Sequence, residues 1–276
     1  MDASLKQRVL TAGLGVPLLL AVLFCPTPVI VAVVMAAALI GMQEYYNATG
    51  LSQKKPLCIL GFLATVIIPL GIYFQADTGL TLVYLYIVIL FFTMLASKNQ
   101  ITFANLATLV MGLIYIPYFL SHIIYIRNME LGNVYIWLVF VGAFLTDTCA
   151  YFVGCAIGGK KLCPSISPKK TVAGAIGGVV GCGLSFILFG IIINSFFAGS
   201  LHGAKLSFEK LFALGLMISV ISQIGDLVAS ILKRQCGIKD FGKLLPGHGG
   251  ILDRCDSIIL VAPAIFLFLL KIGILA

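Results

Sequence analysis

Charged residues are scarce in this chain. Only 10% of its 276 residues are charged, whereas 61% are hydrophobic and the mean hydropathy is +1.12. Soluble domains carry roughly 25% charged residues, so this chain has too little charge to cover a water-facing surface. The composition also excludes a disordered chain, a collagen-like chain and a small disulfide-stapled scaffold. The sequence therefore predicts an integral membrane protein.

Long apolar runs take the place of the missing charge. A transmembrane helix needs about 20 mostly apolar residues, and about nine runs approach that length. We expect an all-α polytopic membrane protein in which region 1–130 holds about five helices. Region 131–276 is expected to hold about four, with cytoplasmic loops at 158–171 and 233–254. The expected spans are 9–25, 27–45, 57–75, 79–96, 104–126, 132–157, 172–195, 210–232 and 255–275.

The first span could be a secretory signal, but no small-x-small cleavage site follows it, so we expect a retained helix.

The distribution of Lys and Arg indicates the orientation, because these residues accumulate on cytoplasmic flanks. With a cytoplasmic N-terminus, the outside segments hold only Arg127, Lys205, Lys210 and Lys271, and the inside segments hold the other 14 of the 18 cations. This asymmetry predicts a cytoplasmic N-terminus and an outside C-terminus.

The eighth span carries a polar stripe. A charged side chain near a helix centre costs roughly 2.5–3.5 kcal/mol, which makes it a functional candidate. The stripe lines either a polar cavity at the cytoplasmic side or the bundle interior, where it would supply only interhelical hydrogen bonds. Its members recur at three- and four-residue steps and so share one helix face: Ser219, Ser222, Gln223, Asp226, Ser230 and Lys233.

The sixth span has a similar face, formed by Asp147, Tyr151, Gly154 and Gly158. We expect Asp147 and Tyr151 to point into the same interior, either to line a cavity or to fix packing and register. In the following span, Gly174-x-x-x-Gly178 and Gly177-x-x-x-Gly181 predict close packing against a neighbouring helix.

The loop at 158–171 carries four lysines and forms an anion-attracting surface. Positive-inside bias and contact with lipid headgroups would also explain Lys160 and Lys161. For Ser167-Pro168-Lys169-Lys170 we expect a proline-fixed turn that places both lysines at the start of a helix. Lys161 stands where a phosphate-cradling P-loop needs Ser or Thr, which excludes that motif.

The segment 226–256 is the richest in charge. Asp253 and Asp256 are three residues apart where the last helix begins, so they can face the same point. Carboxylates without thiolates or paired histidines suit Mg²⁺ rather than zinc. The cations of this segment would bind phosphate groups: Lys233, Arg234, Lys239, Lys243 and Arg254.

This segment resembles the signature of the CDP-diacylglycerol synthases, also called phosphatidate cytidylyltransferases. Asp147 in a D-x-x-A-Y-x-x-G setting and Ser167-Pro168-Lys169-Lys170 are similar to the upstream motifs of that family. The signature residues are Ser230, Leu232, Lys233-Arg234, Lys239-Asp240, Gly242, Leu245, Pro246, His248-Gly249-Gly250, Ile251, Asp253-Arg254 and Asp256.

The resemblance implies an enzyme that transfers the cytidylyl group of CTP to phosphatidate, giving CDP-diacylglycerol and pyrophosphate for phospholipid synthesis. It implies that Asp226, Asp253 and Asp256 hold Mg²⁺, with room for a second cation, and that Lys233 completes the catalytic set. The substrate-binding residues that it implies are Asp147, Ser167, Lys169, Lys170, Ser230, Arg234, Lys239, Asp240, His248 and Arg254.

The resemblance also implies a multi-pass protein of a bacterial-type inner membrane, with its active site facing the cytoplasm. Membrane lipids are expected partners, nucleic acids are not, and a homodimer is compatible with the family.

Two residues depart from the signature: Ala229 stands where Glu is usual, and Cys255 stands where an aliphatic residue is usual. The first removes a carboxylate near the expected metal site, which would weaken metal binding or shift that role to Asp253 or Asp256.

Two other functions remain open at this level. A CTP-dependent polyprenol or phytol kinase would share these features but release CDP in place of pyrophosphate. An ion-coupled secondary transporter could use Asp147 and Asp226, although it would have less need for the five cations of segment 226–256.

Overall fold

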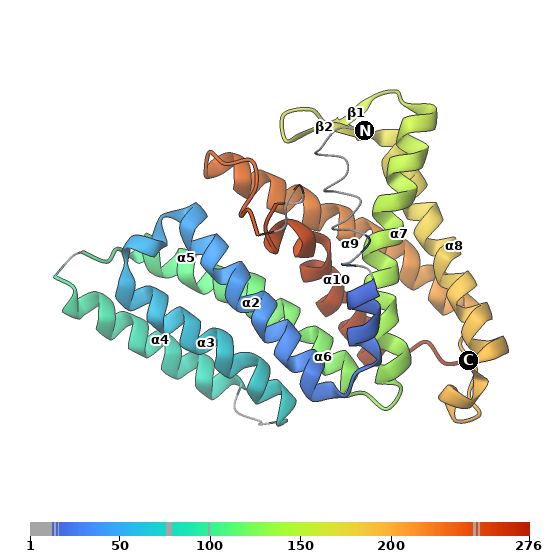
Figure 1. The fold of residues 1–276 in the computed structure, drawn as a ribbon, viewed down its shortest axis with the longest axis horizontal. Helices are drawn as coiled ribbons and strands as arrows, with labels where there is room; N and C mark the ends of the chain where they lie inside the picture. Colours follow the sequence, from blue (N-terminus) through green and yellow to red (C-terminus); the bar gives the residue numbers. More distant parts are fainter. Residues whose placement is uncertain are drawn as a thin grey trace. The chain divides into compact units, whose positions relative to one another are not determined.

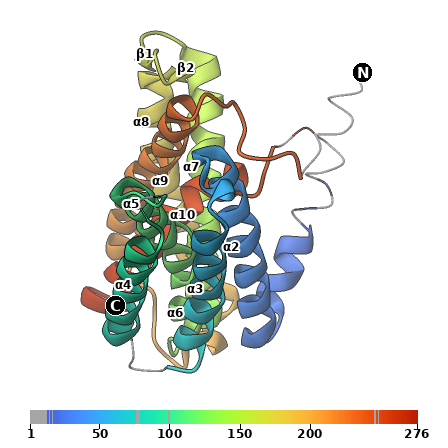
Figure 2. The same ribbon diagram turned by 90° about the vertical axis from the view of Figure 1, so that its left-hand side faces the viewer.

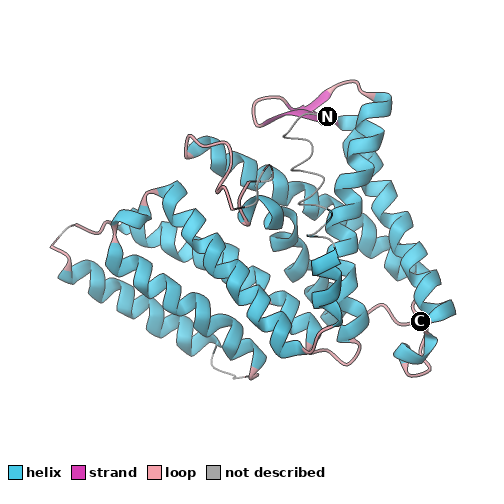
Figure 3. Cartoon of the chain, in the orientation of Figure 1, coloured by secondary structure: helices cyan, strands magenta, loops and turns pink. Residues whose placement is uncertain are grey.

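The computed structural model describes residues 13, 15, 17–75, 79–98, 100–244, 247 and 249–276. The described chain is helical apart from one short β-hairpin (Figures 1 and 3), which confirms the predicted all-α class. Of the predicted first span, residues 17–24 are helical, whereas 9–12, 14 and 16 lie outside the described residues. Within the described ranges, six helices are long and apolar enough to cross a membrane: Thr27–Thr49, Lys55–Tyr73, Phe103–Arg127, Gly132–Ile157, Val172–Phe196 and Phe208–Gln235.

The chain forms two compact units, and each is built from separate stretches. The first unit comprises Met1–Asn128 and Cys236–Arg254, and the second comprises Met129–Gln235 and Cys255–Ala276. The segment 236–254, which the sequence assigns to the C-terminal region, therefore belongs with the N-terminal helices. The order of residues along the chain does not indicate that segment 236–254 folds back to join the N-terminal helices.

The helices of the first unit pack side by side. In Figure 2, α2 lies beside α3, and α3 also contacts α4 and α5. Glycines allow close approach here: a β-carbon on Gly112 would lie 2.5 Å from the Tyr45 ring. The elements of this unit are α2 (Thr27–Thr49), the 3-10 turn η1 (Leu51–Gln53), α3 (Lys55–Tyr73), α4 (Gly79–Ala96), α5 (Phe103–Leu113), the π-helical turn η2 (Ile114–Tyr118) and α6 (His122–Arg127).

The predicted span 104–126 is an interrupted helix. Between α5 and α6 the backbone widens into the π-helical turn η2, which contains Pro117. Proline lacks the N–H that would continue the hydrogen-bond ladder, and its ring crowds the carbonyl four residues earlier. A local π-turn accommodates both effects without ending the span.

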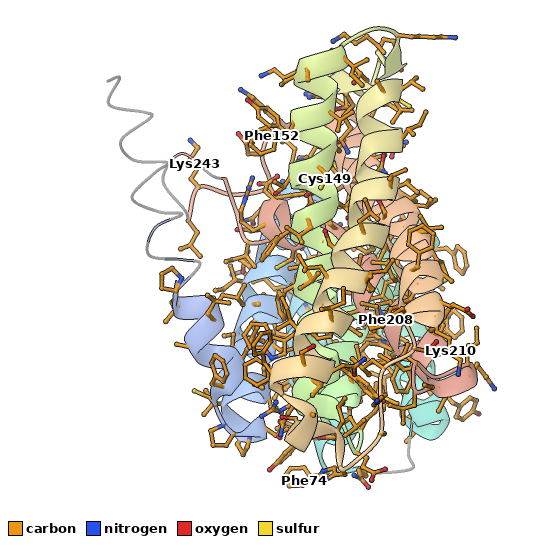
Figure 4. The ribbon with its side chains drawn as sticks, turned by 90° about the vertical axis from the view of Figure 1, so that its right-hand side faces the viewer. Phe74, Cys149, Phe152, Phe208, Lys210 and Lys243 are labelled. Atoms are coloured by element: carbon orange, nitrogen blue, oxygen red, sulfur yellow. The ribbon has the colours of Figure 1, made fainter. Side chains whose placement is uncertain are left out.

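The second unit is built around three long helices, in which α8 packs against both α7 and α9. The predicted close packing of α8 is confirmed, because a β-carbon on Gly174 would lie 2.6 Å from the carbonyl oxygen of Ala150, on α7. Gly181 meets Cys149 in the same way; Cys149 is labelled on α7 in Figure 4. The elements are α7 (Gly132–Ile157), β1 (Lys161–Cys163), β2 (Ser167–Thr171), α8 (Val172–Phe196), the 3-10 turn η3 (Ala198–Leu201), α9 (Phe208–Gln235) and most of α10 (Leu252–Lys271).

Candidate active site

The second unit brings together carboxylates from three helices. Asp256 on α10 lies within electrostatic reach of Asp226 on α9 and Asp147 on α7, and of the ammonium of Lys233. The close crossing of α9 and α10 explains this meeting, because a β-carbon on Gly225 would lie only 2.7 Å from the carbonyl oxygen of Asp256. The Ser257 hydroxyl also donates a hydrogen bond of 3.4 Å to the Ser222 carbonyl. A cluster of carboxylates with cations beside it can bind a metal–phosphate group.

Lys170 forms an ion pair with Asp226, and each side chain is 26% exposed. Lys170 lies in β2, next to Thr171, whose hydroxyl accepts a hydrogen bond of 3.1 Å from Gly174 N at the start of α8. This N-cap satisfies one of the backbone donors that the first turn of a helix leaves open. It also fixes β2 to α8, and so fixes the position from which Lys170 reaches Asp226.

The predicted turn at Ser167-Pro168-Lys169-Lys170 is wrong. These residues form strand β2, which pairs antiparallel with β1 in the register Lys161↔Thr171 and Cys163↔Ser167. The turn lies one step earlier, at residues 164–166. Pro168 fits because an extended residue in a two-stranded ribbon can leave its N–H side unpaired. The lysines consequently alternate in direction, with Lys169 exposed and Lys170 half-buried.

The polar stripe of α9 divides into two parts. Gln223 is buried and donates hydrogen bonds to the Ala175 carbonyl on α8, at 3.2 Å, and to the Ser219 hydroxyl, at 3.3 Å. The deeper part of the stripe therefore supplies interhelical hydrogen bonds, the simpler of the two expected roles. The shallower part, with Asp226, Ser230 and Lys233, stays half-exposed.

Two other positions named in the sequence analysis, Tyr151 and Ala229, can be compared with the structure. Tyr151 on α7 is 67% exposed and Asp147, four residues earlier, is also exposed, so the prediction that both point into the bundle interior is wrong. Ala229 is 1% exposed on α9, in a packed position with little room for a larger side chain.

Asp253 organises the loop that precedes α10. Its Oδ2 accepts hydrogen bonds from Phe241 N, at 2.8 Å, and from Gly250 N, at 2.9 Å, and the side chain is only 5% exposed. Gly249 has φ +85°, a left-handed conformation that glycine adopts without strain. One carboxylate oxygen thus holds two distant points of the loop together, in addition to any role toward a ligand.

Glu44 is absent from the residues predicted from the sequence. It lies near the end of α2, is 6% exposed, and accepts hydrogen bonds from Ile251 N, at 3.0 Å, and Leu252 N, at 2.9 Å. The signal that could have revealed it is the same one used for the sixth and eighth spans: a carboxylate inside an apolar run.

The remaining predicted residues lie on the edges of these elements. Ser167 and Ser230 are half-buried, and Lys169, Arg234, Lys239, Asp240 and Arg254 are exposed. Lys233 and Arg234 occupy the last turn of α9, where cations complement the helix dipole. His248, Leu245 and Pro246 lie outside the described residues.

The carboxylates of this site fit a Mg²⁺ ion that substrate phosphates and water help to bind. Within the part of the chain that the structure describes, no three side chains of His, Cys, Asp or Glu gather into a ready metal cluster. Mg²⁺ is usually held by one or two carboxylates, with substrate phosphates and water completing an octahedron. Asp226 and Asp256 supply oxygens of that kind, whereas a cage made only of protein ligands is not what these residues form.

These features define a polytopic membrane protein with a carboxylate and lysine cluster suited to phosphate chemistry. Comparison with known proteins gives the family: the chain belongs to the cytidylyltransferase family, whose model matches residues 6–272. A phosphatidate cytidylyltransferase from Staphylococcus epidermidis is 32% identical over 271 residues, covering 97% of this chain and all of the relative. Proteins of the same name from Bacillus subtilis (37% identity; 71% of each chain) and Rickettsia bellii (37% identity; 67% of this chain and 79% of the relative) are also similar.

Proposed function

We propose that this protein transfers the cytidylyl group of CTP to phosphatidate and releases CDP-diacylglycerol and pyrophosphate. The observation that carries the proposal is the meeting of Asp147, Asp226 and Asp256 with Lys170 and Lys233 in one unit of a membrane protein. Membership of the cytidylyltransferase family and the names of the relatives support the same reaction.

The reaction requires two polyanions to approach each other. The phosphate of phosphatidate has a second pKa of about 6, so its oxygen is already anionic at neutral pH and needs no strong general base. That oxygen attacks the α-phosphorus of CTP, the bond to the oxygen that bridges the α- and β-phosphorus atoms breaks, and pyrophosphate leaves with that electron pair. The chain must therefore offset charge repulsion and hold the reactants in line.

The cations of the site would perform the first task. Lys170, released from Asp226 when substrate arrives, can bind a phosphate oxygen, and Lys233 at the end of α9 can bind another. Arg side chains can hold two phosphate oxygens at once. The other residues proposed to bind substrate are Asp147, Ser167, Lys169, Ser230, Arg234, Lys239, Asp240, His248 and Arg254.

Asp226, Asp253 and Asp256 are the proposed Mg²⁺ ligands, with a second cation as a further member of the site. When bound, Mg²⁺ would neutralise charge on the phosphates and stabilise the departing pyrophosphate. The carboxylates of Asp226 and Asp256 would hold the ion between them. Asp253 would add to this set while its Oδ2 holds the loop through Phe241 and Gly250.

We further propose about nine membrane spans, a cytoplasmic N-terminus and an outside C-terminus in a bacterial inner membrane. On this topology a polar cavity containing the site opens to the cytoplasm, where CTP is available, and membrane lipids surround the helices. The excess of Lys and Arg in the expected cytoplasmic segments supports this orientation. We also propose that the protein forms a homodimer.

The deciding experiment supplies the purified protein with phosphatidate, Mg²⁺ and CTP labelled in the α- or γ-phosphate. Label from the α-phosphate in the lipid product, with γ-label in pyrophosphate, supports cytidylyl transfer. Label from the γ-phosphate in a lipid, with release of CDP, would indicate a lipid kinase instead. Ion-driven uptake into proteoliposomes without CTP turnover would indicate a transporter.

A further inference from the structure

The carboxylate of Glu44 lies against the first residues of α10. Glu44 is on α2, and its hydrogen-bond donors are more than 200 residues away in sequence but within the same unit. Oε1 accepts from Ile251 N and Oε2 accepts from Leu252 N, at 3.0 and 2.9 Å. Both carboxylate oxygens therefore bind backbone N–H groups that the first turn of a helix leaves without intrahelical partners.

The loop backbone closes around this carboxylate. A methyl group on Gly250 would overlap both carboxylate oxygens of Glu44, and one on Gly242 would lie 2.8 Å from its Cδ. Glycine at these two positions lets the backbone approach from two sides. Among the described residues no ion pair involves Glu44. A buried carboxylate that accepts hydrogen bonds from backbone N–H groups, in place of pairing with a cation, is suited to fixing the position of the backbone.

Glu44 and Asp253 bind consecutive parts of the same segment. Asp253 Oδ2 accepts from Gly250 N, while Glu44 accepts from the next two amides. Three successive N–H groups, at 250, 251 and 252, are thus held by two carboxylates. The second of these carboxylates, Asp253, is itself a proposed metal ligand, and Arg254 beside it is a proposed phosphate ligand.

We propose that Glu44 is a positioning residue: it fixes the backbone at 250–252 and thereby pre-orders the start of α10 for binding of Mg²⁺ and CTP. This inference rests on the proposed function of Asp253 and Arg254, and it gives Glu44 an indirect role, through the backbone that its carboxylate holds. Without this carboxylate the segment samples other conformations, and part of the binding free energy is spent on ordering it.

The test compares Glu44→Gln with the matched control Glu130→Gln, which changes an exposed glutamate ahead of α7. Glutamine keeps the length of the side chain but offers only one acceptor oxygen and turns an NH₂ group toward the second amide. Because apparent affinity scales with the fraction of binding-competent protein, and the variant loses a charge-assisted hydrogen bond that holds this segment, the KM for CTP should rise at least about tenfold. The Mg²⁺ concentration for half-maximal rate should rise with it, while kcat changes less than about threefold.

A merely structural role would lower the amount of active protein, and hence kcat, without moving either half-saturation concentration. That result, or wild-type kinetics in Glu44→Gln, would overturn the proposal. Glu130→Gln is expected to match the wild type in all three quantities.

A second measurement does not depend on activity, and its wild-type half does not depend on a stable variant. Hydrogen–deuterium exchange of substrate-free wild-type protein should show slow exchange at the amides of 250–252, and Glu44→Gln should speed that exchange at least about tenfold. Fast exchange of these amides in the wild type would contradict the positioning role. If the wild type makes no CDP-diacylglycerol but the amides are protected, the proposed function fails while the structural role of Glu44 stands.

Discussion

Lys170 and Asp226 form an ion pair between strand β2 and helix α9, so the only lysine of β2 that is half-buried points at a proposed metal ligand. In the absence of substrate the ammonium neutralises a carboxylate that would otherwise repel Asp256 and Asp147. When a metal–phosphate group arrives, the same lysine is already beside the site.

Replacing Lys170 with Met should lower kcat/KM for CTP at least about tenfold, because a charge-assisted contact to phosphate is lost. Lys205→Met, at an exposed loop position before α9, is the matched control and should behave as the wild type. Initial rates of CDP-diacylglycerol formation measure the effect. Equal rates for both variants would remove Lys170 from the substrate-binding set.

Asp253→Asn should separate ligand chemistry from loop structure. Its amide oxygen can still accept from Phe241 N and Gly250 N, so the variant should keep a wild-type unfolding temperature within a few degrees. Its activity should nearly vanish, because a neutral amide is a poor Mg²⁺ ligand. Rates and thermal unfolding in the same detergent give both quantities. Full activity in Asp253→Asn would contradict the metal-ligand assignment.

Asp226→Asn should be equally inactive, and it provides a contrast with Asp253→Ala. The alanine variant loses the loop hydrogen bonds as well as the carboxylate, so hydrogen exchange at Gly250 should increase in Asp253→Ala but stay unchanged in Asp226→Asn. Increased exchange at Gly250 in both variants would mean that the two carboxylates do not have the separate structural roles described above.

Chelation of divalent metal should abolish activity without unfolding the protein. Among the described residues the site forms no ready cluster of three metal-binding side chains, so Mg²⁺ should bind mainly together with CTP. The expected result is loss of product formation with excess EDTA, full recovery with Mg²⁺, and an unchanged unfolding temperature. Activity that persists in EDTA would contradict the metal requirement.

Thr171→Ala should destabilise the second unit by about 1 kcal/mol, the usual cost of losing a side-chain N-cap. Thr171→Ser keeps the hydroxyl and should retain most of that stability. Thermal unfolding of the two variants measures the difference. If both variants lose the same stability, the effect comes from packing of the threonine methyl group and not from the cap.

Hydropathy predicted most of the helical organisation here, because a bilayer restricts what an apolar run can be. The spans 27–45, 79–96, 132–157 and 172–195 agree with α2, α4, α7 and α8 within a few residues. Spacing also indicated which glycines of α8 meet α7. The residues within each span are sufficient to predict these features, because the features depend on neighbouring residues only.

The remaining features depend on long-range contacts. Ser167–Lys170 forms a strand because it pairs with β1, and nothing within those four residues indicates a partner. Glu44 acquires its partners from Ile251 and Leu252, and Asp253 from Phe241. The sequence motifs predicted which carboxylates bind metal and substrate, but did not predict that one of them, Asp253, holds a loop in place.

The separation between Glu44 and Ile251 also matters while the protein is being made. At 5–20 residues per second, the ribosome needs about 10–40 s to synthesise the residues between them. During that interval the carboxylate on α2 enters the bilayer without the amides that later bind it. The first helices therefore insert into the membrane before segment 236–254, the rest of their unit, has been synthesised. Nascent chains that stop short of this segment should be substrates for insertion chaperones or membrane proteases.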